Sequence, residues 1–522
     1  MSSPSRVARP AQAPTPGTES SARAGWRGWL ALAALMLPVL LVSIDNTVLT
    51  FALPSITEQL RPDGTALLWI VDIYPLVLAG LLVAMGSTAD RVGRRRLLFI
   101  GSTGFLVVSA VAAFSPNATA LIAVRAALGF FGAMLMPSTM SLLRAIFTDP
   151  HQHRLAIAVW SATFATGAAI GPVVGGVLLE HCSWGSIFLA GVPVLLLFLL
   201  VAPFVVPESR DPHPGPVDPV SIVLSLAALA PLVFAIKTVA ESGVTDVALA
   251  SLGLAVLSGI AFVRRQLRRP LPMLDLTLFR SGTFSGAVTA NLLSIFAVVG
   301  FLFFVSQHLQ LVLGQSPLQA AVALLPGAVA SVLAGLAIVP LVRRVPVRYA
   351  MAGGFLLSAA GYGLVVLVAD DPTAAALAAA FVLLSAGIGA AETLSNDAVL
   401  TAAPTDKAGA AAAINETAYE LGAVLGTAVL GSILTASYRS HLQVPAGLTP
   451  EQAHAATETL GGATGVAAGL PAGQAAQLLD SARHAFDSGV VVTAGLGALV
   501  TTAAAVLVVL ALRPPRGIRT EA

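Results

Sequence analysis

Apolar segments of about 20 residues alternate with short polar segments along most of this chain. A helix of that length crosses the ~30 Å hydrocarbon core of a bilayer. We predict 14 such helices, at about residues 29–53, 66–86, 97–114, 118–143, 154–178, 186–206, 219–237, 245–263, 284–308, 317–342, 349–369, 373–400, 408–436 and 487–512. The pattern is typical of an all-α polytopic membrane protein.

The composition agrees with this prediction and excludes a large soluble protein. Of 522 residues, 56% are hydrophobic and only 10% are charged, which is too little charge to cover a soluble core of this size. The single cysteine, Cys182, excludes an internal disulfide. The formal charge of +2 says little about partners, because in a membrane protein the placement of charge matters more than its sum.

Basic residues predict the orientation. If the N-terminus is cytoplasmic, 23 of the 28 Lys and Arg residues fall in cytoplasmic segments, and Arg61, Arg439 and Arg483 fall outside. Arg125 and Lys237 lie within predicted helices. We therefore expect both termini in the cytoplasm, which requires an even number of helices. Arginine supplies all basic residues except Lys237 and Lys407, which is typical of a GC-rich bacterial genome, so the expected location is a bacterial plasma membrane.

A weak internal repeat indicates the domain organisation. The loop "GSTADRVGRRR" after the second helix has a faint counterpart, "GLAIVPLVRRVPVR", after the tenth. This offset predicts two six-helix bundles separated by two inserted helices, an arrangement of repeats found in transporters. The predicted parts are a disordered tail (1–27), the first bundle (28–210), the insert (211–270), the second bundle (271–512) with an extracellular loop (437–486), and a second tail (513–522).

Three ionisable residues in the predicted helices lie at one depth. Arg125 is roughly 10 Å from the outer end of the fourth helix, at 1.5 Å per residue. By the same rise Asp45 is about 12 Å deep in the first helix and Asp72 about 10 Å deep in the second. A charge in hydrocarbon is costly unless it is paired, protonated or facing a wet cavity. We expect a charge cluster that takes up and releases protons. A static ion pair is the structural alternative.

Two glycine-containing segments form recognisable motifs. In "GSTADRVGRRR" the pattern resembles the signature of the major facilitator superfamily and predicts a conformational latch, carried by Gly86, Asp90, Arg91, Gly93 and Arg94. An ordinary basic cytoplasmic loop is the alternative.

The second motif, "GAAIGPVVGG", lies in the fifth helix, where Gly and Pro bend a helix and let backbones approach closely. Its pattern is similar to the antiporter signature of that superfamily and comprises Gly167, Gly171, Pro172, Gly175 and Gly176. Generic packing of small residues is the alternative.

Further segments extend the resemblance over about residues 27–512, namely "DNT…ALP", "WIVDIYPLVLAG", "MPSTMSLLRAIF", "LAIAVW", "VPES", "PMLD" and "AGAAAAINETAYELG". They resemble the 14-helix drug:proton antiporters of the major facilitator superfamily, of the QacA and LfrA type. The resemblance implies a major facilitator fold and proton-driven export of lipophilic, mainly cationic compounds. Quaternary ammonium compounds and dyes such as ethidium are the expected substrates. Whether fluoroquinolones belong to the range is left open.

The resemblance also implies roles for individual residues. Asp45 and Asp72 match intramembrane aspartates of the family, and Arg125 matches its arginine in the fourth helix. Glu416 matches one of two adjacent family glutamates, whereas Asn415 replaces the other, and Ser331 stands where some relatives carry an aspartate. These two departures argue against recognition of dicationic substrates.

The sequence also adds acidic residues of its own. Glu392 and Glu416 should lie at similar depths, roughly 12–13 Å from the cytoplasmic face. Glu420 lies one helical turn beyond Glu416 on the same face. We expect these three glutamates to attract a cationic substrate, with Trp69 and Tyr419 as aromatic candidates.

Other function classes fit less well. Neither lysine follows a glycine and no histidine precedes a glutamate, so the nucleotide-binding Gly-Lys step and the H-E-x-x-H zinc motif are absent. We expect no enzyme activity, cofactor or bound metal, and no nucleic acid partner. The expected partners are lipophilic cations, protons and membrane lipids, bound by a monomer. An exporter dedicated to a single natural product or antibiotic remains the alternative function.

Overall fold

The computed structural model describes residues 24–211, 217–270, 272–404 and 407–512. Most of the two predicted tails, residues 1–23 and 513–522, lies outside the described residues. Within the described part, 14 helices are long and apolar enough to cross a membrane. The predicted number of spans is therefore confirmed.

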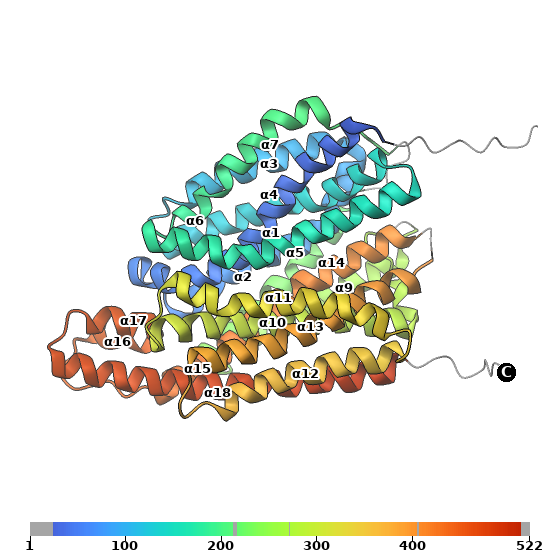
Figure 1. The fold of residues 1–522 in the computed structure, drawn as a ribbon. Helices are drawn as coiled ribbons and strands as arrows, with labels where there is room; N and C mark the ends of the chain where they lie inside the picture. The colour runs from blue at the N-terminus through green and yellow to red at the C-terminus, as the bar shows by residue number, and fades with distance from the viewer. Residues whose placement is uncertain (1–23, 212–216, 271, 405–406, 513–522) are drawn as a thin grey trace, which may run out of the picture.

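The first bundle contains six of these spans. Its helices are α1 (Trp26–Leu60), α2 (Gly64–Val92), α3 (Arg94–Ala112), α4 (Ala118–Ile146), α5 (Pro150–His181), and the broken pair α6 (Ser186–Leu189) and α7 (Gly191–Val205). Within the bundle α1 packs against α5 and α7, and α4 packs against α2 and α3. Figure 1 shows this bundle in blue to green.

The second bundle follows in yellow to red (Figure 1). It begins with η1 (Leu276–Arg280), α10 (Gly282–Gln307), η2 (His308–Val312), α11 (Pro317–Leu341), α12 (Val347–Leu367) and α13 (Ala374–Ala402). It continues with α14 (Ala408–Gly426), η4 (Thr427–Gly431), α15 (Ser432–His441) and, after a loop, α18 (Ala472–Ala511). η2 and η4 are π-helical segments, which are frequent at functional sites.

Two inserted helices, α8 (Pro219–Ser242) and α9 (Asp246–Arg268), form a hairpin between the bundles. Asp218 caps α8 through the Ser221 N–H and also binds Arg265 at 2.8 Å. The hydrogen bonds from Arg265, more than the opposing effect of burial, hold the pKa of Asp218 well below its usual range. The hairpin is thus closed by an ion pair at its polar end.

The loop before the last span is ordered into two short helices, α16 (Pro450–Glu458) and α17 (Leu460–Ala467). α17 packs against α1 and α18, so the loop of the second bundle reaches the first bundle. The last helix begins at Ala472, well before the expected start at 487. Hydropathy marks where a helix enters the membrane, and the polar segment 472–486 continues the same helix beyond that point.

Candidate functional site

A cavity of about 350 Å³ lies between the two bundles. Its walls come from α1, α2, α4 and α5 on one side and from α10, α11, α13, α14 and η4 on the other. Small-molecule sites typically measure about 300–1,000 Å³ and favour interfaces between domains. The cavity therefore has the size and place of a site for a small molecule.

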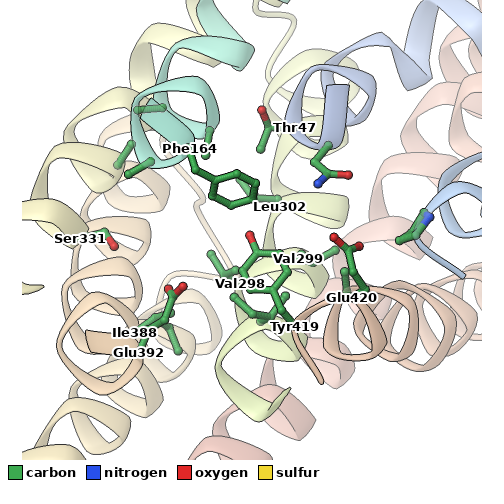
Figure 2. Close-up of a pocket in the computed structure, with 18 of the residues that line it drawn as sticks. Thr47, Phe164, Val298, Val299, Leu302, Ser331, Ile388, Glu392, Tyr419 and Glu420 are labelled. Atoms are coloured by element: carbon green, nitrogen blue, oxygen red, sulfur yellow. The ribbon is translucent and has the colours of Figure 1, made fainter. Parts of the chain in front are cut away.

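Three of the predicted acidic residues line this cavity. Glu392 comes from α13, and Glu416 and Glu420 come from α14. Glu420 is 1% exposed, and its Oε2 atom has no hydrogen-bond partner among the described residues. Figure 2 shows Glu392 and Glu420 on opposite sides of the Tyr419 ring. Within the described part of the chain none of these three carboxylates forms an ion pair, so a cation in the cavity would meet carboxylates without a basic partner.

Aromatic rings cross the cavity from one bundle to the other. The Phe164 ring of α5 meets the predicted Tyr419 ring edge-on at 5.9 Å between centroids, and Trp160 stacks on Phe164 at 6.0 Å. Sequence reasoning did not identify Trp160 or Phe164. The sequence feature that could have identified them is their spacing. They lie one turn apart, directly before the glycine motif of the same helix.

Asp45 and Arg125 form a buried ion pair beside the cavity. Arg125 Nη1 lies 2.9 Å from Asp45 Oδ2, and 2% and 8% of the two side chains are exposed. Arg125 also donates a hydrogen bond from Nε to the carbonyl oxygen of Ile70, and its guanidinium lies over the Tyr74 ring. Arg125 lines the cavity whereas Asp45 lies behind it. A ligand can therefore reach the pair through Arg125.

Asp72 is not part of that pair, so the expected cluster of three charges is divided in two. Its Oδ2 atom lies 2.8 Å from Nζ of Lys237 on the inserted helix α8, and both side chains are fully buried. Trp69 is also placed differently from the expectation: its ring lies 4.0 Å from the Lys237 ammonium and does not line the cavity. Asp72 lies on the face of α2 that meets α8, and this face decides its partner.

The glycine motif of α5 packs against α1. A Cβ atom at Gly167 would lie 2.7 Å from Ser43 Cβ, and one at Gly171 would lie 2.2 Å from Thr47 Oγ1. Gly175 meets Val48 in the same way, while Gly176 faces the backbone of Leu318 at the start of α11 in the other bundle. These glycines allow backbone contact both within the first bundle and between the bundles.

The charged motif contacts the end of the first bundle. Asp90 binds Arg94 at 2.8 Å, and Gly93 adopts a φ of 117°, which a residue with a side chain rarely adopts. Arg94 donates to Ser209 through its backbone and its guanidinium. Gly86 faces Pro137 of α4, and Arg91 is exposed. The motif thus holds the α2–α3 turn against the segment that follows α7.

The structure adds a polar network that sequence reasoning did not identify. Asn291 of α10 donates to Asn415 of α14, which donates to Asn396 of α13 at 2.6 Å. Asn396 lines the cavity. The only sequence signal was a set of amides inside apolar helices. In the described residues no group of three or more His, Cys, Asp or Glu side chains is placed to hold a metal ion.

Comparison with known proteins identifies the family. The family model for the Major Facilitator Superfamily matches residues 35–427. The chain belongs to this superfamily. It is 56% identical over 497 residues to the multidrug efflux pump LfrA of Mycolicibacterium smegmatis, covering 95% of this chain and 99% of that protein. It is 38% identical over 463 residues to the methyl viologen resistance protein SmvA of Salmonella typhimurium LT2, covering 88% and 93%.

A third relative is the tetracenomycin C resistance and export protein of Streptomyces glaucescens, 32% identical over 80% of this chain and 78% of that protein. Among solved structures, a bacterial homolog of the human lysosomal transporter Spinster matches with a TM-score of 0.65 at 17% identity. That match covers 93% of this chain and 97% of the solved one and supports the fold alone. This major facilitator protein is therefore a multi-pass membrane protein, homologous to bacterial efflux pumps and resistance exporters.

Proposed function

We propose that this major facilitator protein exports lipophilic, mainly cationic compounds in exchange for protons. The observation that carries the proposal is the cavity between the bundles, where Glu392, Glu416 and Glu420 face a wall of aromatic and aliphatic side chains without basic partners among the described residues. A carboxylate attracts a cation, and the apolar wall accepts the lipophilic remainder of such a molecule. The relative LfrA is named as a multidrug efflux pump, and SmvA is named for resistance to methyl viologen, an organic dication. The first name supports a broad range of substrates and the second a cationic class.

Competition between a proton and a cation supplies the coupling. Burial favours the neutral form of a carboxyl group, and a nearby positive charge favours its ionised form. A proton and a cationic substrate therefore exclude each other at one carboxylate. Asp45 exchanges a proton in the same way, because its protonation releases Arg125 into the cavity, and Asp72 provides a second such group.

The conformational change requires the bundles to rock against each other around the cavity. The α1–α5 glycine contact keeps the first bundle rigid, and the Asp90–Arg94 turn acts as a latch. We propose a bacterial plasma membrane protein with both termini in the cytoplasm, acting as a monomer surrounded by lipid. Quaternary ammonium compounds and ethidium are the substrates to test first.

The test uses purified protein in proteoliposomes that carry an acidic interior. Adding ethidium outside should dissipate the pH gradient with wild-type protein and leave it intact in protein-free liposomes. Asp45→Asn should lose this exchange, while Glu451→Gln, an exposed acid in the loop helix α16, should keep it. A gradient that is insensitive to every cation tested would overturn the proposed function.

A second candidate is an exporter dedicated to one natural product. It is favoured by the similarity to the tetracenomycin C export protein and by the largely apolar wall of the cavity. A substrate panel separates the two candidates. The multidrug exporter should exchange several unrelated cations at comparable rates, whereas the dedicated exporter should exchange one compound and no simple cation.

A further inference from the structure

The inserted helix α8 brings a charge to the first bundle. Lys237 Nζ lies 2.8 Å from Asp72 Oδ2 and 4.0 Å from the centre of the Trp69 ring. Both charged side chains are fully buried. A buried ion pair costs several kcal/mol per ion in lost hydration, and well-packed apolar residues are often as stable in its place. Stability alone therefore explains the pair poorly.

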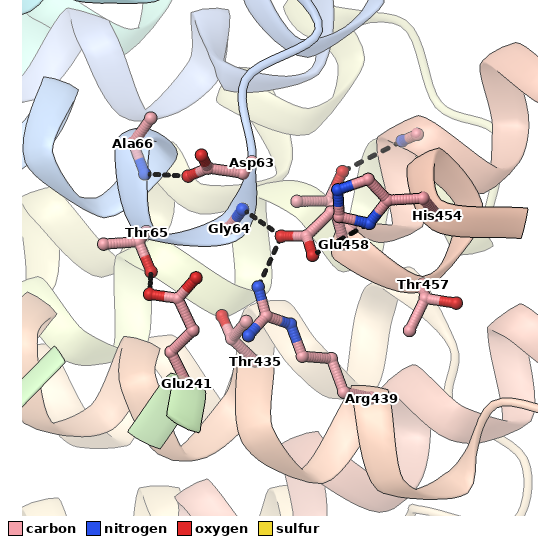
Figure 3. A network of polar contacts seen from close by, with 12 residues as sticks. Asp63, Gly64, Thr65, Ala66, Glu241, Thr435, Arg439, His454, Thr457 and Glu458 are labelled. Carbon is pink, nitrogen blue, oxygen red and sulfur yellow. Dashed lines mark hydrogen bonds and ion pairs between the residues drawn. The ribbon is translucent and has the colours of Figure 1, made fainter. Parts of the chain in front are cut away.

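α8 contacts α2 at three positions along its length, which fixes the backbone of Lys237 beside Asp72. Thr65 at the start of α2 donates to Glu241 at 2.5 Å, as Figure 3 shows. Ser225 donates to the carbonyl oxygen of Gly80, where the missing Cβ lets Leu226 approach. The ion pair lies between these two contacts. These contacts hold α8 against α2, while α15 and η4 of the second bundle pack on it as well.

The ion pair lies directly behind the wall of the cavity, where the bundles meet. The neighbours of Asp72 on α2, Val71 and Pro75, line the cavity, as does Thr427 of η4. α8 packs against η4 as well as α2. A small apolar cluster that includes Leu76 of α2 and Val233 of α8 fills the space between these helices and the second bundle. Separation of α2 from η4 would therefore open the pair to the cavity.

We propose that the Lys237 ammonium is a built-in competitor of the proton at Asp72, so that the inserted hairpin takes part in proton exchange. This inference rests on the proposed function. In the conformation described here Lys237 binds Asp72 as a cationic substrate would bind a free carboxylate. When α2 separates from η4, the pair opens to the cavity. A proton then adds to the Asp72 carboxylate, and the Lys237 side chain swings away with its own proton while α8 stays against α2. Lys237 is thus a positioning residue and does not contact substrate.

Other charged groups near the pair already have partners or face elsewhere. Arg125 of α4 binds Asp45, Arg439 of α15 binds Glu458, and Glu241 of α8 binds Thr65. Three titratable groups of α14 line the cavity, namely Glu416, Tyr419 and Glu420. Tyr74 of α2 and Tyr438 of α15 are buried. The other charged or titratable residues of the packed elements lie at helix ends: Asp90 and Arg91 of α2, Arg144 of α4, His441 of α15, and Asp246, Arg264, Arg265 and Arg268 of α9. Among the described residues Lys237 is the cation paired with Asp72.

The test measures how exchange depends on pH in proteoliposomes, with ethidium as the substrate. Lys237→Met removes the competitor, so the pH of half-maximal exchange should rise by about one unit or more, since a nearby opposite charge shifts such equilibria by about 1–3 units. Lys237→Arg keeps the cation and should keep the midpoint. Lys407→Met, at the other lysine of the chain, is the matched control and should also keep it.

The double variant Asp72→Asn/Lys237→Met carries the test even if Lys237→Met fails to reach the membrane, because it leaves no unpaired charge. It should lose the Asp72-dependent limb of the pH profile and move fewer protons per ethidium. A double variant with the wild-type profile and proton count would show that the pair is only structural and would overturn the inference. Failure of wild-type protein to exchange at all would overturn the proposed function and this inference with it.

Discussion

Arg125 on α4 holds Asp45 on α1 in an ion pair of 2.9 Å, and only the arginine reaches the cavity. The pair joins two helices of the first bundle at the wall that faces a substrate. A change in the charge of Asp45 therefore changes the cavity through Arg125. Two kinds of variant separate the structural part of this pair from its part in coupling.

Asp45→Asn should abolish exchange and destabilise the protein. It leaves the Arg125 charge buried without a counter-ion, which costs about 3–5 kcal/mol when one partner of a buried pair is removed. Asp45→Asn/Arg125→Met removes both charges and should restore thermal stability in detergent. Exchange should remain lost in the double variant. A double variant that recovers both stability and coupling would show that the pair serves the fold alone.

The cavity carboxylates should determine affinity for charge and leave affinity for apolar ligands unchanged. Glu420→Gln should weaken ethidium binding about tenfold, or 1.4 kcal/mol. The expected loss in binding free energy is smaller than the full attraction between two unit charges, which is ~4 kcal/mol at 4 Å and an effective dielectric constant of 20. Glu392→Gln and Glu416→Gln should also weaken ethidium binding. Fluorescence titration of purified protein measures the affinity of each variant.

An uncharged aromatic ligand of similar size is the control for this series. Its affinity should change less than twofold in each variant, because the aromatic wall remains intact. Equal losses for charged and uncharged ligands would contradict the electrostatic role of the glutamates and indicate a change in the shape of the cavity.

Counting residues from the sequence could place charged side chains at a common level, but it could not decide which of them pair. Counting residues from the helix ends placed Asp45 and Arg125 at one level, where the structure pairs them. The same count gave Lys237 no partner, because it placed Lys237 at the very end of the seventh span. α8 continues to Ser242, so Lys237 lies five residues before the end of the helix, where it faces Asp72. Hydropathy falls where polar side chains begin, and a helix ends only where its backbone hydrogen bonds end.

The residues that line the cavity could likewise be predicted only in part. The acidic residues stand out in apolar helices, so Glu392, Glu416 and Glu420 could be found from their charge. Trp160 and Phe164 could not be separated from lipid-facing aromatic residues, because orientation around the helix depends on how the bundles pack. Trp69 was misplaced for the same reason, since it lies on the α8 face of α2.

Gly171→Ala should impair both stability and exchange. The added Cβ atom would lie 2.2 Å from Thr47 Oγ1 and 3.1 Å from the carbonyl oxygen of Ile44, so α5 must move away from α1. Overpacking of this kind costs about 1–3 kcal/mol. Gly253→Ala on α9 is the matched control, since its Cβ meets no atom within 4 Å and alanine favours a helix. Thermal unfolding in detergent should show a lower midpoint for Gly171→Ala only.

The last prediction concerns the loop helices α16 and α17, which connect the bundles at the end of the molecule where α2 begins. Glu458 accepts a hydrogen bond from the N–H of Gly64 at 2.9 Å and pairs with Arg439 of α15 (Figure 3). Directly after this pair, Gly461 of α17 packs against Thr57 of α1. These contacts tie the second bundle to the first and keep this end closed.

Glu458→Gln should therefore open this end more often. Hydrogen bonds to charged groups contribute about 1.5–3 kcal/mol, so loss of the charge should raise the open population by about tenfold or more. The measurement is the rate at which a membrane-impermeant maleimide labels Thr57→Cys, in a background where the exposed Cys182 is replaced by Ser. Glu451→Gln, on the exposed side of the same helix α16, is the control and should leave the rate unchanged. Equal labelling rates in the two variants would show that the Glu458 contacts do not hold the bundles together.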